Sequence, residues 1–195
     1  MLKIGITGGI GSGKSTACLV FEKLGIPVYY SDTRAKELMI EDQELIASIK
    51  AHFGNEVYSG SILNNKVLAS IVFADKNELK ILNDLVHPAV GRDYKNWLSQ
   101  YKNENYTLKE AALLYEAGIY KELDKVIVVT CPLETRVERV MKRDKVSKEE
   151  VMKRVQNQWE EKEKVKLSDY LLDNSGTELL ITQVVKLHKE ILKLK

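Results

Sequence analysis

Three things are scarce in this sequence: cysteine, long apolar runs and an excess of charge of one sign. Two cysteines, Cys18 and Cys131, exclude a disulfide scaffold and are typical of a reduced protein. No apolar run approaches the roughly 18 residues of a membrane span, and the start lacks the apolar stretch of a signal peptide. We therefore expect a cytosolic protein. The net charge of +2 is too even to favour nucleic acid or a membrane surface as the main partner.

The 195 residues suit one domain, and a hydrophobic content of 44% provides a sizeable core. Short apolar runs rich in β-branched residues predict strands buried on both faces, as in a parallel sheet covered by helices. Such runs occupy residues 2–7, 27–30, 108–115, 125–130 and 169–173. The pattern predicts an α/β fold.

Helical patterns separate these runs. Asp75 resembles a helix start, Ser147 and Glu150 form a capping box followed by apolar residues as far as Trp159, and an apolar stripe from Leu180 to Leu194 predicts a terminal helix. The stretch between the second and third runs is longer than an ordinary crossover. We therefore expect residues 31–106 to be an inserted helical substrate region, residues 134–164 to be a charged, mobile helical cover, and residues 1–30, 107–133 and 165–195 to form the core.

The sharpest motif is the glycine-rich segment Gly8–Thr16, which satisfies G-x-x-x-x-G-K-[ST] between a buried strand and an amphipathic helix. Glycines let backbone N–H groups approach phosphate oxygens, and the N-terminus of the helix favours an anion. Lys14 is placed to reach the β- and γ-phosphates, and the Ser15 hydroxyl to hold Mg²⁺. The motif predicts a nucleoside triphosphate site; the alternative is a tight turn without a ligand.

Motifs of other nucleotide-binding classes are incomplete. The guanine-reading pattern N-K-x-D fails at Leu68, because Asn65-Lys66-Val67-Leu68 lacks the acid. A motor or transporter ATPase would show four apolar residues ending in Asp-Glu, whereas Ala112–Glu116 ends in Glu alone. A small phosphotransferase fits better with the short chain and its arginine-rich cover.

Asp32 directly follows the second predicted strand. In an open α/β sheet the ligand crevice lies beyond the carboxyl ends of the strands. An acid there could accept a proton from an attacking hydroxyl. The alternative is a helix N-cap with no catalytic role.

Arg136, Arg139 and Arg143 are spaced by three and four, so they share one helix face. Such a face can close over a migrating phosphoryl group and offset its charge. The alternative is a solvated helix in which the arginines pair with Glu134 and Glu138.

Four further residues are candidates for binding. Pro88 disfavours a helical conformation at His87, so His87-Pro88 is expected to interrupt the helical pattern and kink the segment. The alternative for His87 is a purely structural histidine. Glu116 ends the third predicted strand and could orient Mg²⁺ or substrate, or be a surface acid. Asn174 and Gly176 follow the fifth strand at the edge suited to an adenine contact, although Asn-Ser-Gly is also ordinary turn chemistry.

Longer strings extend these motifs along the chain: Ile6–Ser15, Ser31-Asp32 with Ala35-Lys36, Leu85–Pro88, Leu113–Glu116, Arg139 with Arg143-Asp144, and Asp173–Gly176. With them the sequence resembles the dephospho-CoA kinase family nearly end to end. The string Thr7–Ser15 is far more specific than the generic phosphate loop.

The resemblance implies an ATP-dependent kinase that phosphorylates the ribose 3′-hydroxyl of dephospho-CoA with Mg²⁺, the last step of coenzyme A synthesis. It implies a P-loop three-layer fold with a five-stranded parallel sheet, an inserted helical CoA region and a helical lid. The expected partner is this small-molecule substrate, with neither nucleic acid nor a membrane.

The resemblance also assigns residues. Asp32 is the expected general base, Arg143 reaches the ATP phosphates from the lid, and Asn174 and Gly176 lie near adenine. The expected catalytic residues are therefore Lys14, Asp32 and Arg143, and the expected metal ligand is Ser15. The expected ATP contacts are Gly9, Gly11, Ser12, Gly13, Lys14, Ser15, Thr16, Arg139, Arg143, Asn174 and Gly176. The expected substrate contacts are Thr7, Asp32, Lys36, His87 and Glu116.

The sequence departs from the family pattern in three places. Tyr30 stands where the family often has a second acid, so this sequence does not predict two-acid metal binding at that turn. Ala112 replaces a frequent proline, and Lys36 replaces an arginine, keeping the charge but losing the two-pronged geometry. Arg136 lies outside the family pattern. Another small-molecule kinase on the same core, or a nucleotide-gated binding module, is the alternative function.

Overall fold

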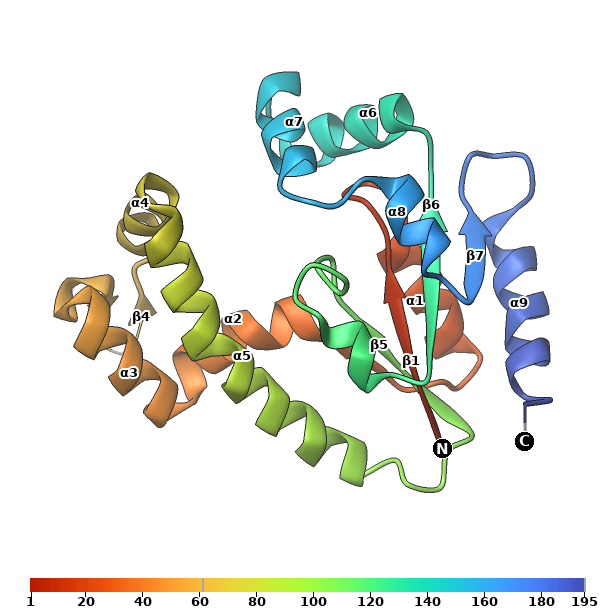
Figure 1. The fold of residues 1–195 in the computed structure, drawn as a ribbon, viewed down its shortest axis with the longest axis horizontal. Helices are drawn as coiled ribbons and strands as arrows, with labels where there is room; N and C mark the ends of the chain where they lie inside the picture. The colour runs from red at the N-terminus through yellow and green to blue at the C-terminus, as the bar shows by residue number, and fades with distance from the viewer. Residues whose placement is uncertain (61, 195) are drawn as a thin grey trace. The chain divides into compact units, whose positions relative to one another are not determined.

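The computed structural model describes residues 1–60 and 62–194 (Figure 1). The chain forms two compact units. The core unit comprises residues 1–30 and 101–195, and the helical unit comprises residues 31–100. No helix within the described residues is both long and apolar enough to cross a membrane.

The core unit is built on a sheet of five parallel strands in the order β2-β5-β1-β6-β7. The strands are β1 (Leu2–Thr7), β2 (Val28–Tyr30), β5 (Tyr106–Glu110), β6 (Lys125–Thr130) and β7 (Tyr170–Asp173). The predicted α/β class and parallel sheet are confirmed. Strand β1 is central and pairs with β5 on one side and β6 on the other, so the phosphate loop leaves from the middle of the sheet.

Helices and loops cover both faces of this sheet. The helices of the unit are α1 (Lys14–Lys23), α6 (Leu133–Asp144), α7 (Lys148–Gln156), α8 (Glu161–Lys166) and α9 (Leu180–Ile191), with a 3₁₀ turn at Ile119–Glu122. On one face, α1 and α9 bury Phe21 and Val184 against Ile4 and Ile6 of β1. On the other face, Leu114 packs in a cluster with Tyr115 and Val128.

Three expectations about elements of the core unit need correction. The third strand is Tyr106–Glu110 and does not extend to Tyr115. Leu114 and Tyr115 are apolar because they pack beneath the sheet from a turn, not because they belong to a strand. The capping box at Ser147 is present, but α7 ends at Gln156, so Trp159 lies outside it. The terminal helix ends at Ile191, short of Leu194.

Over residues 31–60 and 62–100, the helical unit shows four α-helices and a two-stranded antiparallel hairpin. Its elements are α2 (Ser31–Glu41), α3 (Gln43–Phe53), a 3₁₀ turn (Asn55–Val57), β3 (Tyr58–Ser59), β4 (Ile62–Leu63), α4 (Asn65–Ala74) and α5 (Lys76–Ser99). The side chains of Asp42, Asn64 and Asp75 each accept a hydrogen bond from the first turn of the helix that follows. The hairpin was not expected from the sequence.

The predicted interruption at His87-Pro88 is wrong, because α5 runs from Lys76 to Ser99 with Pro88 inside it. Proline removes one helical hydrogen bond and disfavours helix at the preceding residue. The flanking residues Val86 and Ala89 are buried, and α5 packs against α2, α3 and α4. Packing of this buried face therefore outweighs the local preference.

Candidate active site

The phosphate loop joins β1 to α1 in the core unit. Gly11 has φ 79° and Gly13 has φ 101°, a region that residues with a Cβ rarely adopt. Gly13 stands at the N-cap of α1, and no side chain caps that helix. A helix start whose N-cap residue offers no side chain can present its backbone N–H groups to an anion, which is the arrangement that binds phosphate.

Two side chains add polar groups to this loop. Lys14 is buried, and its Nζ donates to the Gly8 carbonyl oxygen at 3.0 Å, so the ammonium folds back over the loop. Ser12 is fully buried, and its Oγ has no hydrogen-bond partner among the residues described. A buried hydroxyl without a partner is costly, and a phosphate oxygen would satisfy it.

Ser15 and Thr16 lie in the first turn of α1, and both are exposed. Mg²⁺ prefers hard oxygen ligands and usually keeps several waters and phosphate oxygens in its shell. The accessible Ser15 hydroxyl, one residue after Lys14, suits such a shared shell. No group of three or more His, Cys, Asp or Glu that could hold a metal occurs in residues 1–60 and 62–194.

The residues after β7 contact the phosphate loop. Asn174 Nδ2 donates to the Ser12 carbonyl oxygen at 2.8 Å. Arg139 of α6 donates from Nη2 to the Asn174 carbonyl oxygen at 3.4 Å and from Nη1 to Cys131 Sγ at 3.3 Å. Burial raises the pKa of the Cys131 thiol, and the Arg139 cation opposes that shift. The structure therefore brings together the loop, Arg139 and Asn174, three parts of the expected ATP site. Gly176 lies in the exposed turn that follows, with φ 102°.

The three arginines of α6 do not share one environment. Arg139 and Arg143 are exposed, whereas Arg136 is buried against the phosphate loop. A solvated face is therefore wrong for Arg136. Arg143 forms two hydrogen bonds with Asp144, at 2.7 and 3.1 Å, and Arg154 contacts the same carboxylate at 2.7 Å. The Arg143 guanidinium, with Arg154 adding to it, holds the pKa of Asp144 below its usual range.

Glu116 does not end a strand, because β5 stops at Glu110 and Glu116 lies in a turn. Its Oε1 accepts from the Trp159 backbone N–H at 2.7 Å and lies 2.8 Å from Lys164 Nζ. Thr7 is fully buried, and its hydroxyl donates to the Ala112 carbonyl oxygen at 3.4 Å. Both residues thus have partners within the core unit.

Asp32, Lys36 and His87 belong to the helical unit. Asp32 lies in the first turn of α2 and Lys36 one turn later, and both are exposed. His87 is exposed on α5, next to Pro88. Their part in the site stays a prediction from the sequence.

Comparison with known proteins covers almost the whole chain. The family model described as "Dephospho-CoA kinase" matches residues 2–179. A dephospho-CoA kinase of Bacteroides fragilis (strain YCH46) is 37% identical over 186 residues, covering 95% of this chain and 91% of that protein. The chain belongs to the dephospho-CoA kinase family.

Two solved structures agree with this membership. The protein TT1252 from Thermus thermophilus is 34% identical with a TM-score of 0.87, over 100% of this chain and 98% of that one. A dephospho-CoA kinase from Campylobacter jejuni is 29% identical with a TM-score of 0.73, over 98% of this chain and 97% of that one. The family is one of ATP-dependent kinases, so ATP is the nucleotide substrate and the predicted enzyme class is confirmed.

One buried acid near the phosphate loop of this dephospho-CoA kinase family member, Glu110, was not predicted from the sequence. Glu110 is buried at the carboxyl end of β5, in register with Ile6 on one side and Tyr30 on the other. Its carboxylate therefore lies on the strand next to Tyr30, the position at which the resemblance led us to look for a second acid. Burial raises the pKa of Cys18, and Glu110 adds to the shift while Lys14 opposes it. The available signal was a pair of charges, Lys109-Glu110, inside an otherwise apolar stretch.

Proposed function

We propose that the protein transfers the γ-phosphoryl group of ATP to the ribose 3′-hydroxyl of dephospho-CoA in the cytoplasm, giving CoA and ADP. The observation that carries this proposal is the phosphate loop with its uncapped helix N-terminus, in a chain that matches the family model over residues 2–179.

The ATP phosphates would lie in the loop of residues 8–15. The N–H groups at the start of α1, the Ser12 hydroxyl and the Lys14 ammonium are the proposed donors to their oxygens. The Ser15 hydroxyl is the proposed protein ligand of Mg²⁺, which when bound offsets negative charge on the β- and γ-phosphate oxygens. The contact between Asn174 and Ser12 supports placing adenine near Asn174 and Gly176, with Arg139 beside it.

The acceptor side rests on Asp32. In a loose phosphoryl-transfer transition state, the attacking hydroxyl needs orientation and late removal of its proton. An exposed carboxylate at the start of α2 suits both tasks: it accepts a hydrogen bond from the hydroxyl and takes the proton as the new O–P bond forms. Thr7, Lys36, His87 and Glu116 remain the proposed substrate contacts.

Arg143 would release Asp144 to reach the ATP phosphates. Arg154 contacts the same carboxylate and is therefore a matched control. We expect Arg143→Ala to lower kcat strongly, because one charge that offsets the transferring phosphoryl group is lost. Arg154→Ala should leave kcat within about twofold, since a surface ion pair contributes little. Equal losses of kcat in the two variants would show that activity depends on the ion pairs of Asp144 as a group, rather than on Arg143 itself.

The activity is tested directly by incubating the purified protein with Mg-ATP and dephospho-CoA and detecting the 3′-phosphorylated product. We expect stoichiometric formation of CoA and ADP, with adenosine and shikimate far poorer acceptors. Slow ATP hydrolysis independent of any acceptor would favour a nucleotide-gated binding module. Folded protein that binds ATP yet forms no CoA would contradict the proposal.

A further inference from the structure

Two side chains from later parts of the core unit contact the phosphate loop. The first is Gln158, in the connection between α7 and α8, whose Oε1 accepts from the Ile10 N–H at 2.9 Å. The second is Arg136 on α6, whose guanidinium lies so close to Gly9 that a Cβ there would overlap Nη1. We call Gly9–Gly11 the loop tip, and Arg136 with Gln158 the brace.

Arg136 has an environment that stability alone does not explain. The residue is only 8% exposed, and its Nε has no hydrogen-bond partner in the described part of the chain. The nearest acid, Glu161, lies 3.9 Å from Nε, too far for a hydrogen bond. Burying an incompletely paired cation costs several kcal/mol in general. A guanidinium held there against Gly9 is better explained by its effect on the loop.

Gln158 is held by its neighbours in the chain. The Trp159 N–H donates to Glu116 Oε1 at 2.7 Å, and Lys164 Nζ lies 2.8 Å from the same oxygen. The Trp159 ring stacks on Tyr115, with centroids 6.1 Å apart and planes within 9°. These contacts fix the backbone beside Gln158, so its amide oxygen is a preorganised acceptor for the loop tip.

The brace also borders empty space. A cavity of about 370 Å³ lies beside Arg136 and Gln158 and is lined in part by Val155 and Gln156. The same space lets substitutions at these positions be accommodated without overpacking.

We propose that Arg136 and Gln158 are positioning residues for phosphoryl transfer, holding the loop tip in the conformation that places the γ-phosphate for attack. This inference rests on the proposed kinase function. Neither side chain is assigned a contact with the phosphate. Both act through the backbone of Gly9–Gly11, in which small displacements matter because misplacement by about 1 Å can cost on the order of 10²-fold in rate.

The test compares Gln158→Leu, Gln158→Glu and Arg136→Met with the control Gln156→Leu, which borders the same cavity. The measurements are kcat with dephospho-CoA, the dissociation constant of ADP, and the hydrogen-exchange rate of the Ile10 amide. For Gln158→Leu we expect Ile10 exchange to rise and kcat to fall, each by roughly tenfold, as for the loss of one hydrogen bond that holds the loop. ADP affinity should stay within about threefold.

The other variants sharpen the result. Gln158→Glu keeps an acceptor oxygen, so it should retain Ile10 protection and most of kcat. Arg136→Met should lower kcat with ADP affinity retained, and Gln156→Leu should change neither. Unchanged Ile10 exchange in Gln158→Leu would overturn the proposal, as would faster exchange with an unchanged kcat.

Failure of the proposed function gives a different result. Wild-type protein that makes no CoA would refute the dephospho-CoA kinase activity. The brace would then be judged by Ile10 exchange with a non-hydrolysable ATP analogue bound. Extra protection in wild type but not in Gln158→Leu supports the brace, and equal rates in the two proteins refute it.

Discussion

The two units of the chain prepare for phosphoryl transfer in different ways. In the core unit the expected site is largely backbone: the N–H groups of a glycine loop and an uncapped helix start, fixed by the central strand β1. In the helical unit it consists of single exposed side chains, above all Asp32. A backbone site is hard to remove by one substitution, whereas a side-chain site can be switched off with the fold intact.

The largest effect should come from the helical unit. Asp32→Asn keeps the size of the side chain but removes its charge and basicity. We expect kcat to fall by roughly 10²–10⁴, the range for a general acid–base group, with the dissociation constants of ATP and dephospho-CoA within a few-fold. Steady-state kinetics and calorimetric titration measure both. Because Asp32 lies inside the first turn of α2 rather than at its N-cap, activity within about threefold of wild type would remove it from the mechanism.

The corresponding change in the core unit is Lys14→Ala. The Lys14 ammonium folds back onto the loop and donates to the Gly8 carbonyl oxygen. We expect kcat/KM to fall by at least about 10²-fold, on the scale of removing one preorganised electrostatic contact, while backbone N–H groups retain part of the nucleotide binding. Circular dichroism must match wild type for the comparison to hold. Near-normal turnover would remove the loop from the catalytic site.

A smaller effect concerns what holds the helical unit together. Arg34 on α2 binds Asp93 on α5 through Nε at 3.1 Å and Nη2 at 2.8 Å, and both side chains are partly buried. We expect Arg34→Met to lower the free energy of unfolding by about 2 kcal/mol, as for hydrogen bonds to charged groups. Urea denaturation measures the loss.

Arg92 is the matched control for Arg34. It pairs with Asp42 and Glu44 from a more exposed position on the same helix as Asp93. Arg92→Met should cost less than about 1 kcal/mol, as exposed ion pairs do. Losses of equal size would mean that burial does not distinguish the two pairs.

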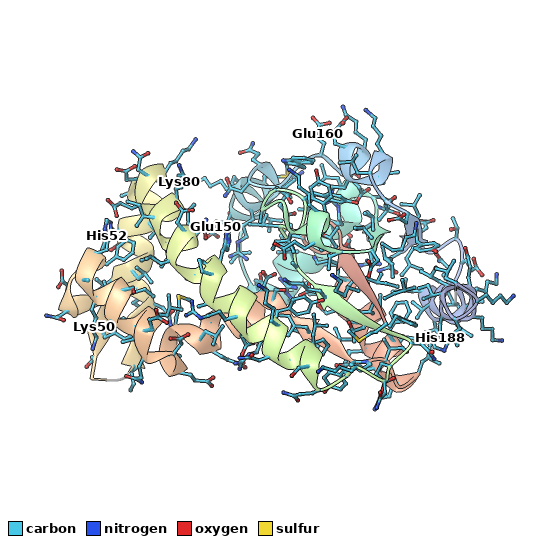
Figure 2. All side chains as sticks on the ribbon, turned by 60° about the horizontal axis from the view of Figure 1, so that its bottom comes forward. Lys50, His52, Lys80, Glu150, Glu160 and His188 are labelled. Atoms are coloured by element: carbon cyan, nitrogen blue, oxygen red, sulfur yellow. The ribbon has the colours of Figure 1, made fainter. Side chains whose placement is uncertain are left out.

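The smallest effect is a pH dependence of the core unit. His188 of α9, labelled in Figure 2, shares a 2.8 Å hydrogen bond with the buried Tyr106 hydroxyl. Burial, helped by the Lys189 cation, lowers the pKa of His188 below its ordinary value of about 6.5. The unfolded chain therefore binds this proton more readily than the folded one.

The folded protein is therefore expected to lose stability as the pH falls. Stability from His188 is fully present above about pH 6.5 and is lost as the pH falls through the lower folded-state pKa. Thermal melts between pH 7.5 and 5 should show a declining Tm, and His188→Gln should flatten the slope. An unchanged slope in the variant would assign the decline to other groups.

The sequence predicted best those features that depend only on residues close together in the chain. Strands β1 and β6 depend on apolar runs of neighbouring residues, and both were predicted with the bounds that the structure has. The end of β5 was missed because Leu114 is buried by a turn rather than a strand. The continuation of α5 through Pro88 was missed because packing overrides local preference.

The candidate site shows the same limit. Arg136 and Arg143 have the same side chain and a regular helical spacing, yet one is buried and the other exposed. The difference is made by Gly9 and Glu161, which are distant in sequence. Gln158 belongs to no motif, and only the fold brings it to Ile10. Glu110 is visible in the sequence only as a charged residue within an apolar run. Its place beside Ile6 and Tyr30 depends on strand pairing, which the sequence does not show.

The central position of β1 has a consequence during synthesis on the ribosome. Strand β1 pairs Leu2 with Tyr106 and Ile4 with Lys125, so both of its neighbours in the sheet are made much later than β1 itself. At about 5–20 residues per second, an apolar strand and its glycine loop wait on the order of ten seconds before any pairing within the sheet is available. The intervening helical unit, made entirely of nearer contacts, can fold in that interval. Nascent chains arrested before β5 should therefore need protection from aggregation that the finished protein does not.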